Sequence, residues 1–583
     1  MSFRWNYARL ENDSALSTLQ QQLGVSPVIA RLLALRGITN YDKAKTFFRP
    51  GDRHVHNPYK MRDMETAATR LAAAIRNQES ILIYGDYDVD GTTSTSILYL
   101  FFKQFGLKPL YFIPHRFKDG YGISIDGIQK AIEQEASLVV SVDCGITAID
   151  EADYAREQGL DLIICDHHNA GADLPEAYAV IDPKRPDCNY PFDGLSGAGV
   201  AYKLVQATLE KLGLPESNAH QFLDLVAISI ASDIVPLIDE NRALMREGLK
   251  LINTNPRVGI RALAELIRLN IGTISTSQIV FSLGPRINAA GRMQNASLAV
   301  ELLIAEDYAH AKNKAQELES INKKRRDTDT LTMTQAMEII ENDTNLEKET
   351  ALVLHDPGWH LGVIGIVASR IVDMYCRPTI MLSTVDGYIK GSARSIKGFN
   401  IYNALQQCGD LLVQFGGHAF AAGLTMKPEN LPAFRNRLRE VIAEDLCQDD
   451  FKPELTIDAE LDLSKVDLKF WKILNQFEPF GPQNLRPVFV SRSLRVVGTP
   501  SVVGNGHLKM KVSQNGSAPF DVIGFNMHEH LPMVLKANGS GIDIAYVLEE
   551  NTWRQKKSLQ IRLKDVAQTR DHKKLRATAG LNE

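Results

Sequence analysis

Short apolar runs alternate with longer mixed segments between about residues 80 and 290 of the chain. Ile81–Ile83, Leu138–Val142 and Leu162–Cys165 are rich in Val, Ile and Leu, the composition of buried parallel strands. The segments between them have the length and composition of helices. Strands and helices that alternate in this way predict a doubly wound α/β domain.

The pattern changes twice further along the chain. Between Ala305 and Ile340 the sequence is rich in Ala, Glu, Lys and Leu and contains neither Gly nor Pro, which predicts one long helix. A second lobe opens with an apolar run at Ala351–Leu354, and from about residue 452 short strands separated by turns predict a small barrel. We therefore expect an α/β protein with two α/β lobes joined by a long helix and followed by a C-terminal OB-like β-barrel.

Composition narrows the class of protein. A formal net charge of -5 is unlike that of many nucleic-acid binders, so any path for nucleic acid must be a local basic groove. Six cysteines without C-x-x-C spacing favour reduced thiols. The N-terminus lacks an apolar signal core, and no apolar run approaches the length of a membrane span. We expect a cytoplasmic protein with no membrane partner.

Three aspartates, Asp86, Asp88 and Asp90, follow the first apolar run, with Gly91 directly after them. Carboxylates this close raise one another's pKa, and a divalent cation would neutralise them. An EF-hand calcium loop begins in the same way, but it needs a glutamate at its twelfth position, which Ile97 occupies here, and a helix on each side. A metal site is therefore favoured over an EF-hand, and a solvated surface loop remains the alternative.

Two further strands end in side chains that can bind a metal. Asp143 follows Leu138–Val142, and Asp166, His167 and His168 follow Leu162–Cys165. In open parallel sheets the functional crevice lies outside the carboxyl ends of the strands, so these side chains should converge.

A fourth segment also offers a carboxylate, because Asp233 ends an apolar helical stretch just before Pro236. A lone charge is costly to bury, and an aspartate at a helix C-terminus opposes the helix dipole. Coordination of a metal is favoured here, with a structural aspartate as the alternative.

At these positions the chain resembles the DHH phosphoesterase superfamily, named for a triad that appears here as Asp166-His167-His168, and within it the RecJ-like single-strand-specific exonucleases. The resemblance covers nearly the whole length. It also includes Asp143–Gly145, Ser232–Pro236, Gly284–Arg292, Gly391–Arg394 and Gly416–Gly423. It implies hydrolysis of single-stranded DNA from the 5′ end to mononucleotides, in DNA recombination and repair.

The pattern of the sequence and the resemblance together give the expected parts of the chain. They are an N-terminal helical segment packed on the catalytic lobe at 1–75, a DHH catalytic domain at 76–295, a connecting long helix at 296–345, a DHHA1-like domain at 346–448, an OB-like nucleic-acid-binding domain at 449–570 and a flexible tail at 571–583.

Carboxylates and imidazole without thiolate favour Mn²⁺ or Mg²⁺, and two ions could activate water and stabilise an in-line displacement at phosphorus. The expected ligands are Asp86, Asp88, Asp90, Asp143, His167 and Asp233. Asp143 is expected to bridge the ions, and Asp86 is either a ligand or a group that supports one. His168 resembles the family histidine that touches the scissile phosphate. Asp166 is expected to orient a neighbouring histidine instead of binding metal.

Other residues are expected to hold the DNA. Arg116, Ser392 and Arg394 resemble the family pocket for a 5′-phosphate, which suits arginine because its fork binds phosphate oxygens in pairs. Arg286 and Asn288 are expected to steady the adjacent backbone of the strand.

Two more candidates lie further along the chain. Gly416-Gly417-His418 is expected to be a tight turn whose backbone N–H groups form an anion nest beside an imidazole, and a plain turn is the alternative. In the OB-like region, Trp553 is expected to stack on bases.

The expected partner is single-stranded DNA, with a single-strand-binding protein and a helicase as further candidates, and the chain is expected to be a monomer. Three other functions stay open. A DHH phosphodiesterase of short oligoribonucleotides or cyclic dinucleotides usually lacks the added barrel and arginine pocket, and a manganese pyrophosphatase is much shorter. A binding protein that has lost catalysis would not keep an intact ligand set.

Overall fold

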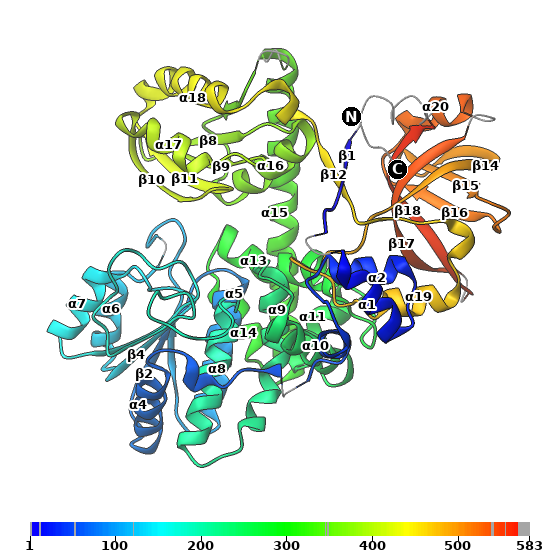
Figure 1. Ribbon diagram of the computed structural model, residues 1–583. Helices are drawn as coiled ribbons and strands as arrows, with labels where there is room; N and C mark the ends of the chain where they lie inside the picture. Colours follow the sequence, from blue (N-terminus) through cyan, green and yellow to red (C-terminus); the bar gives the residue numbers. More distant parts are fainter. Residues whose placement is uncertain are drawn as a thin grey trace. The chain divides into compact units, whose positions relative to one another are not determined.

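The computed structural model describes residues 3–10, 13–51, 54–120, 122–343, 346, 349–537, 541–553 and 556–569. The chain divides into two compact units. The larger unit spans residues 50–451, and the smaller one combines residues 1–49 with residues from 452 onward. Figure 1 traces the elements of both units.

A five-stranded parallel sheet forms the centre of the first lobe of the larger unit, in the order β3-β2-β4-β5-β6. Its strands are β2 (Ile81–Tyr84), β3 (Leu110–Phe112), β4 (Leu138–Val142), β5 (Asp161–Cys165) and β6 (Ala179–Ile181). The helices around it are α4 (Met64–Arg76), α5 (Val89–Lys103), α6 (Ile125–Glu133), α7 (Ile149–Glu157) and α8 (Gly197–Lys211), with the short turn η2 (Pro58–Lys60).

Alternate residues of each strand serve the two faces of this sheet. Ile81 and Ile83 pack with α4, α5 and α8 in one core, whereas Leu82 and Tyr84 pack with α6 and α7 in another. The period of two in a strand sends neighbouring side chains to opposite faces, so both must be apolar when helices cover both. The predicted doubly wound domain is confirmed.

A helical layer follows the sheet and leads into the long helix. It consists of η3 (Glu216–Phe222), α9 (Leu223–Ser232), α10 (Asp239–Thr254), α11 (Val258–Leu266), α12 (Thr276–Gln278), η4 (Ile279–Leu283), α13 (Gly284–Met293) and α14 (Ser297–Leu303). The long helix predicted between Ala305 and Ile340 is α15 (Tyr308–Asp343). It packs on α11, α13 and α14 of the first lobe and on α16 of the second, so it joins the two (Figure 1).

The second lobe holds a five-stranded sheet in the order β10-β11-β9-β8-β7, in which only β7 and β8 run parallel. Its strands are β7 (Leu352–His355), β8 (Thr379–Val385), β9 (Tyr388–Arg394), β10 (Leu412–His418) and β11 (Ala421–Met426). Its helices are α16 (Leu361–Tyr375), α17 (Ile401–Gln407) and α18 (Leu431–Asp445), with the turns η5 (Gly409–Leu411), η6 (Pro428–Asn430) and η7 (Gln448–Phe451).

The smaller unit contains the predicted barrel. Strands β14, β15, β16, β18 and β17 pair in that order, and a further pairing of β14 with β17 closes the ring. The elements are β12 (Glu454–Ile457), β13 (Ala459–Glu460), η8 (Leu463–Lys465), α19 (Leu468–Asn475), β14 (Phe489–Val503), β15 (His507–Ser513), β16 (Phe520–Gly524), η9 (His528–His530), α20 (Leu531–Lys536), β17 (Ile542–Trp553) and β18 (Lys556–Gln568).

The N-terminal segment differs from the sequence expectation. Residues 4–7 form the strand β1 (Arg4–Tyr7), which pairs with β12, and Leu19, Ile29 and Leu33 lie in the core of the barrel unit. These last residues come from the helices α1 (Ser14–Leu23) and α2 (Pro27–Ala34), which α3 (Tyr41–Phe48) follows. The expectation that residues 1–75 pack on the catalytic lobe is therefore wrong for residues 1–49, because an amphipathic helix does not specify which apolar surface will cover it.

Two further expectations concern the C-terminal tail and membrane-spanning helices. The tail at 571–583 lies outside the described residues, and the other domain limits stay predictions. Within the described part of the chain, no helix combines the length and the apolar character needed to cross a membrane.

Candidate active site

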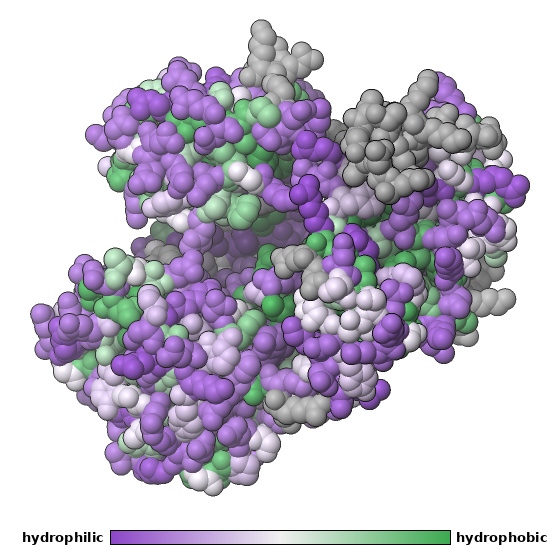
Figure 2. Space-filling view, viewed as in Figure 1, coloured by the Kyte–Doolittle hydropathy of each residue, from purple (hydrophilic) through white to green (hydrophobic). Residues whose placement is uncertain are grey.

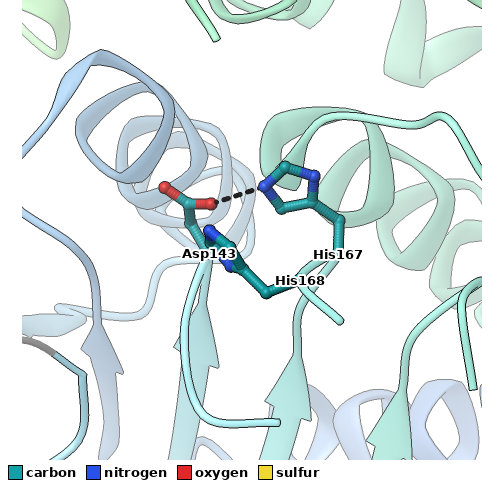
Figure 3. A group of neighbouring side chains, drawn as sticks. All are labelled: Asp143, His167 and His168. Carbon is teal, nitrogen blue, oxygen red and sulfur yellow. Dashed lines mark ion pairs between the residues drawn. The ribbon is translucent and has the colours of Figure 1, made fainter. Parts of the chain in front are cut away.

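The carboxyl ends of β2, β4 and β5 bring the predicted acidic and imidazole side chains together. Asp86 follows β2, Asp143 follows β4 and His167 follows β5, and all three are buried. Asp143 has a positive φ of 61°, so its backbone turns sharply at the end of the strand. Figure 3 shows the carboxylate of Asp143 facing the ring of His167, with His168 beside them.

His167 lies at the centre of the cluster. Its Nε2 is 3.0 Å from Oδ1 of Asp143, and 3.6 Å from Oδ2 of both Asp90 and Asp233. Its Nδ1–H donates a 2.9 Å hydrogen bond to the carbonyl oxygen of Leu195. The lone pair of the neutral ring is therefore on Nε2, where it can bind a metal. Burial lowers the pKa of His167, so the ring stays neutral, the form that binds metals.

Asp90 is fixed by the start of α8 and by α9. Its two oxygens accept hydrogen bonds from the backbone N–H groups of Gly197 (2.7 Å) and Ala198 (2.8 Å) and from Oγ of Ser229 (2.7 Å). A helix N-terminus stabilises a negative charge through its free N–H groups and its dipole. A Cβ atom at Gly197 would lie 2.8 Å from the side chain of Asp143, so only glycine lets α8 approach this closely.

Crowded carboxylates give the cluster a strong demand for positive charge. Burial, and then the neighbouring carboxylates, raise the pKa of Asp86, Asp88 and Asp143 above the ordinary range and raise the pKa of Asp233 to about 9. Oδ1 of Asp86, Oδ1 of Asp143 and Nε2 of His167 are buried without a hydrogen-bond partner. Buried polar atoms rarely stay unpaired, so these atoms fit a bound cation.

The donors form three overlapping groups whose ligand atoms lie within 4.8 Å of one another. These groups are Asp90, His167 and Asp233; Asp86, Asp88 and Asp143; and Asp143, His167 and His168. The first two groups share no residue, which fits two ions, and Asp143 reaches both sides through its short distance to His167. Oxygen and imidazole donors without thiolate are those of Mn²⁺ or Mg²⁺.

Asp166 serves the histidines, as expected from the sequence. Its Oδ1 accepts a hydrogen bond of 2.7 Å from Nδ1 of His168, and its Oδ2 accepts one of 2.9 Å from the N–H of Ile146. Burial is the largest single effect and would raise the pKa of Asp166, but the hydrogen bond and charge of His168, with His167 and the N–H of Ile146, together lower that pKa to about 2. Burial is also the largest single effect at His168 and would lower its pKa, but the bond to Asp166 and the charges of the nearby carboxylates together raise that pKa to about 9. His168 is therefore a cation at neutral pH.

A cavity of about 250 Å³ adjoins the acidic cluster, and its walls also carry positively charged side chains. Its walls are Asp86, Tyr87, Asp88, Arg116, Asp143, His168, Asn288 and Arg292. The guanidinium of Arg116 lies over the ring of Tyr87, 4.9 Å from its centroid. Arg292, which sequence reasoning missed, is buried, and burial together with nearby Arg116 lowers its pKa to about 10. Its position four residues after Asn288 on one helix was the available signal.

Ser392 and Arg394 lie on β9 of the second lobe, and the charge of Arg394 acts on Arg292 in the wall of the cavity. Nη1 of Arg394 donates a 2.8 Å hydrogen bond to Oγ of Ser392, so the two share one face of β9. Burial, and then the charge of Arg116, lower the pKa of Arg394. Within the described part of the chain, Arg116, Arg292 and Arg394 form no ion pair with a carboxylate. Guanidinium groups without a carboxylate partner have the charge and the donors that suit a phosphate.

Other expected DNA contacts are placed differently. Arg286 does not line the cavity, because its Nε donates a 2.5 Å hydrogen bond to Glu319 of α15. Gly416, Gly417 and His418 lie in β10 and pair with β11, so the predicted tight turn is wrong. The backbone of Trp553 ends β17, and its side chain lies outside the described residues.

Comparison with known proteins agrees with this architecture. Residues 80–230 match the N-terminal domain of the DHH family, residues 348–444 the DHHA1 domain and residues 457–565 the RecJ OB domain. The single-stranded-DNA-specific exonuclease RecJ of Bacillus subtilis is 38% identical over 567 residues, which cover 97% of this chain and 71% of that protein. The chain belongs to the RecJ family.

RecJ proteins from other bacteria match over most of their length. RecJ of Haemophilus influenzae is 34% identical over 553 residues, 92% of this chain and 95% of that protein. The crystal structure of RecJ from Thermus thermophilus in complex with Mn²⁺ has a TM-score of 0.82 and 29% identity, and covers 98% of this chain and 80% of that one. A Mg²⁺ complex of the same protein has a TM-score of 0.77 and 27% identity. The fold predicted from the sequence is confirmed.

Proposed function

We propose that this chain is a metal-dependent exonuclease that degrades single-stranded DNA from its 5′ end to mononucleotides, in DNA recombination and repair. The observation that carries the proposal is the cavity in which the acidic cluster of Asp86, Asp88 and Asp143 meets Arg116 and Arg292. A cleavage centre and a site for a terminal phosphate then share one space. Mn²⁺ or Mg²⁺ is the cofactor, and the donor groups fit two ions.

Each ligand has a defined task in this proposal. Asp90, His167 and Asp233 hold one ion, Asp86 and Asp88 hold the other, and Asp143 joins the two. The bound ions supply Lewis-acid activation of water and neutralise the charge that develops on the phosphoryl oxygens. The buried protein groups position the scissile phosphate and exclude bulk water, which strengthens every charge interaction in the site. No covalent nucleophile from the protein is needed.

His168 contacts the scissile phosphate as a cation. Its Nδ1 donates to Asp166, so the contact to the phosphate is assigned to its Nε2–H. A charge-assisted hydrogen bond to a non-bridging oxygen stabilises the transition state when the bond strengthens as negative charge grows. Asn288, whose Oδ1 has no hydrogen-bond partner, lines the same cavity and steadies the backbone of the strand.

The arginines select the 5′ end of the strand. Arg116, Arg292 and Arg394, with Ser392, bind the terminal phosphate through charge-assisted hydrogen bonds. Because the phosphate pocket lies at a fixed distance from the metal ligands, each cut releases one nucleotide. His418, with Gly416 and Gly417 on the same edge strand β10, contacts a further phosphate. Trp553 of the barrel stacks on bases of single strands.

The setting of the enzyme follows from this chemistry. It needs free single strands, which a helicase produces and a single-strand-binding protein covers, so these are the proposed protein partners. The chain is also proposed to act as a monomer. Reduced cysteines agree with a cytoplasmic location.

End-labelled substrates test the proposed function. The chain is incubated with Mn²⁺ and 5′-labelled or 3′-labelled single strands, duplex DNA, short RNA or pyrophosphate. The proposal predicts mononucleotides released from the 5′ ends of single-stranded DNA, and intact duplex. Equal cleavage from 3′ ends, or hydrolysis of pyrophosphate alone, would refute the proposed function. Asp143→Ala is the matched control for a contaminating nuclease, because it should be inactive on every substrate.

A further inference from the structure

The helix α13 lies along the active site in a fixed direction. Asn288 and Arg292 line the cavity, and a Cβ atom at Gly284 would lie 2.9 Å from Oγ of Ser232, the residue before Asp233. Positions 284, 288 and 292 are four apart and share one face of the helix. This face runs about 12 Å, from the Asp233 side of the metal cluster to the arginine pocket.

This direction orients the DNA, given the proposed function. If the 5′-phosphate lies at Arg292 and the scissile phosphate at the metal ligands, the strand leaves toward Gly284. The step from Arg292 to Asn288 is about 6 Å along the helix, close to the spacing of neighbouring phosphates in an extended single strand. The nucleotide on the 3′ side of the cut therefore lies near the start of α13.

Two large apolar side chains face solvent at this end. Phe281 is 76% exposed in the π-helical turn η4, between Ile279 and Leu283, which are buried. Such turns shift side chains out of helical register and are frequent at functional sites. Ile234 is 72% exposed and has a φ of 61°, a strained conformation for a β-branched residue. The packing of α9 on η4 brings the two segments together.

We propose that Phe281, with Ile234 as the second apolar side chain at this end, is a stacking platform for the nucleobase on the 3′ side of the scissile phosphate. Every base has a flat π face, so stacking holds a base without regard to sequence, which suits an enzyme that degrades any single strand. An exposed aromatic ring serves this task because no reorganisation of the protein is needed. The strained backbone at Ile234 follows Asp233 directly, so the platform and the metal cluster share one segment.

The test combines a protein change with a DNA change. Binding of single strands is measured with Phe281→Ala and with Phe281→Trp, both made in the Asp143→Ala background so that the DNA stays intact. The second nucleotide from the 5′ end carries either a normal base or an abasic site. Tyr178→Ala is the matched control, because Tyr178 is an exposed aromatic residue at the opposite end of the sheet, where its N–H bonds to Leu162.

We expect Phe281→Ala to bind the normal strand roughly tenfold more weakly, and Phe281→Trp to bind it as tightly as the parent. The abasic strand should bind the parent roughly tenfold more weakly, with no further loss in Phe281→Ala, because both changes remove the same contact. Tyr178→Ala should bind both strands normally.

Two results would refute the proposal that Phe281 is a stacking platform. One is equal binding by Phe281→Ala and the parent. The other is a loss in Phe281→Ala that is the same for the normal and abasic strands. A shift in oligomeric state in Phe281→Ala without coupling to the abasic site would mean that a second copy of the chain covers this surface, and would also refute the platform. Failure of the wild-type chain to cut from 5′ ends would instead refute the proposed function, so the two failures are distinguishable.

Discussion

Nε2 of His167 lies 3.0 Å from Oδ1 of Asp143, and neither atom has a hydrogen-bond partner. Two polar atoms that meet in a buried cluster without bonding to each other face a common third group. The surrounding carboxylates of Asp90 and Asp233 make that group a cation. The contact therefore links the strand tips to the proposed metal chemistry.

Replacing Asp143 should stop turnover while leaving single-strand binding largely intact. Asp143 belongs to one proposed ion site and lies 3.0 Å from His167 of the other, so Asp143→Ala weakens both but leaves the arginine pocket unchanged. Losing several kcal/mol of transition-state stabilisation lowers the rate roughly a thousandfold or more. Steady-state rates and DNA affinities check this, with Asp150→Ala on the exposed start of α7 as the control. Normal cleavage by Asp143→Ala would refute its bridging role.

Arg116→Ala should reduce the preference for 5′-phosphorylated over 5′-hydroxyl strands. A charge-assisted contact to a phosphate contributes about 1 to 3 kcal/mol, or roughly tenfold to a hundredfold in the ratio of kcat/KM values. Arg286→Ala is the informative control, because Arg286 pairs with Glu319 outside the cavity and should keep the preference. If Arg116→Ala keeps the preference and Arg286→Ala loses it, the pocket lies elsewhere.

The stabilisation of the protein by a divalent cation should grow with pH. Burial raises the pKa of Asp233 from an ordinary value of 3.8 to about 9, so the folded metal-free protein keeps a proton that the unfolded chain releases. Its stability contribution is therefore lost as the pH rises from about 4 toward 9, and a bound cation replaces the proton.

The shift in Tm caused by Mg²⁺, measured against EDTA, should then be larger at pH 8.5 than at pH 6. Asp233→Asn should reduce this dependence because it removes one of the carboxylates whose pKa is raised. An equal shift at both pH values in the wild-type chain would contradict the role given to these carboxylates.

The barrel should bind single strands through Phe525. This ring is 49% exposed, with the guanidinium of Arg562 5.2 Å from its centroid and the ring of His507 5.1 Å away. Base stacking contributes about 1 to 3 kcal/mol per base, so Phe525→Ala should weaken binding of long strands by that amount. Leu468→Ala, an exposed apolar change on α19 of the same unit, is the control for titrations at fixed salt. Equal affinities for both variants would exclude this surface.

The metal cluster could be predicted because its signals are local. An apolar run that ends in Asp or His marks a buried strand and its tip together, as at Asp143 and His167. The parallel order of the strands then brings the tips to one edge of the sheet. The role of Asp233 could be predicted for a similar reason, since a single carboxylate in an apolar helix needs a partner.

Other features depend on contacts that span long stretches of the chain. Arg286 and Arg292 lie in the same motif, yet Glu319 on α15 binds the first and leaves the second in the cavity. The helices α1 and α2 bury apolar faces in the barrel, and nothing in their own sequence names that partner. At Gly416–His418 the pairing with β11 overrides the turn preference of two glycines.

Anomalous scattering from crystals grown with Mn²⁺ tests the central claim most directly. The account predicts two peaks, one among Asp90, His167 and Asp233 and one among Asp86, Asp88 and Asp143, and the loss of at least one in Asp143→Ala. Crystals without a manganese peak in this cluster, or with peaks unchanged by Asp143→Ala, would contradict it.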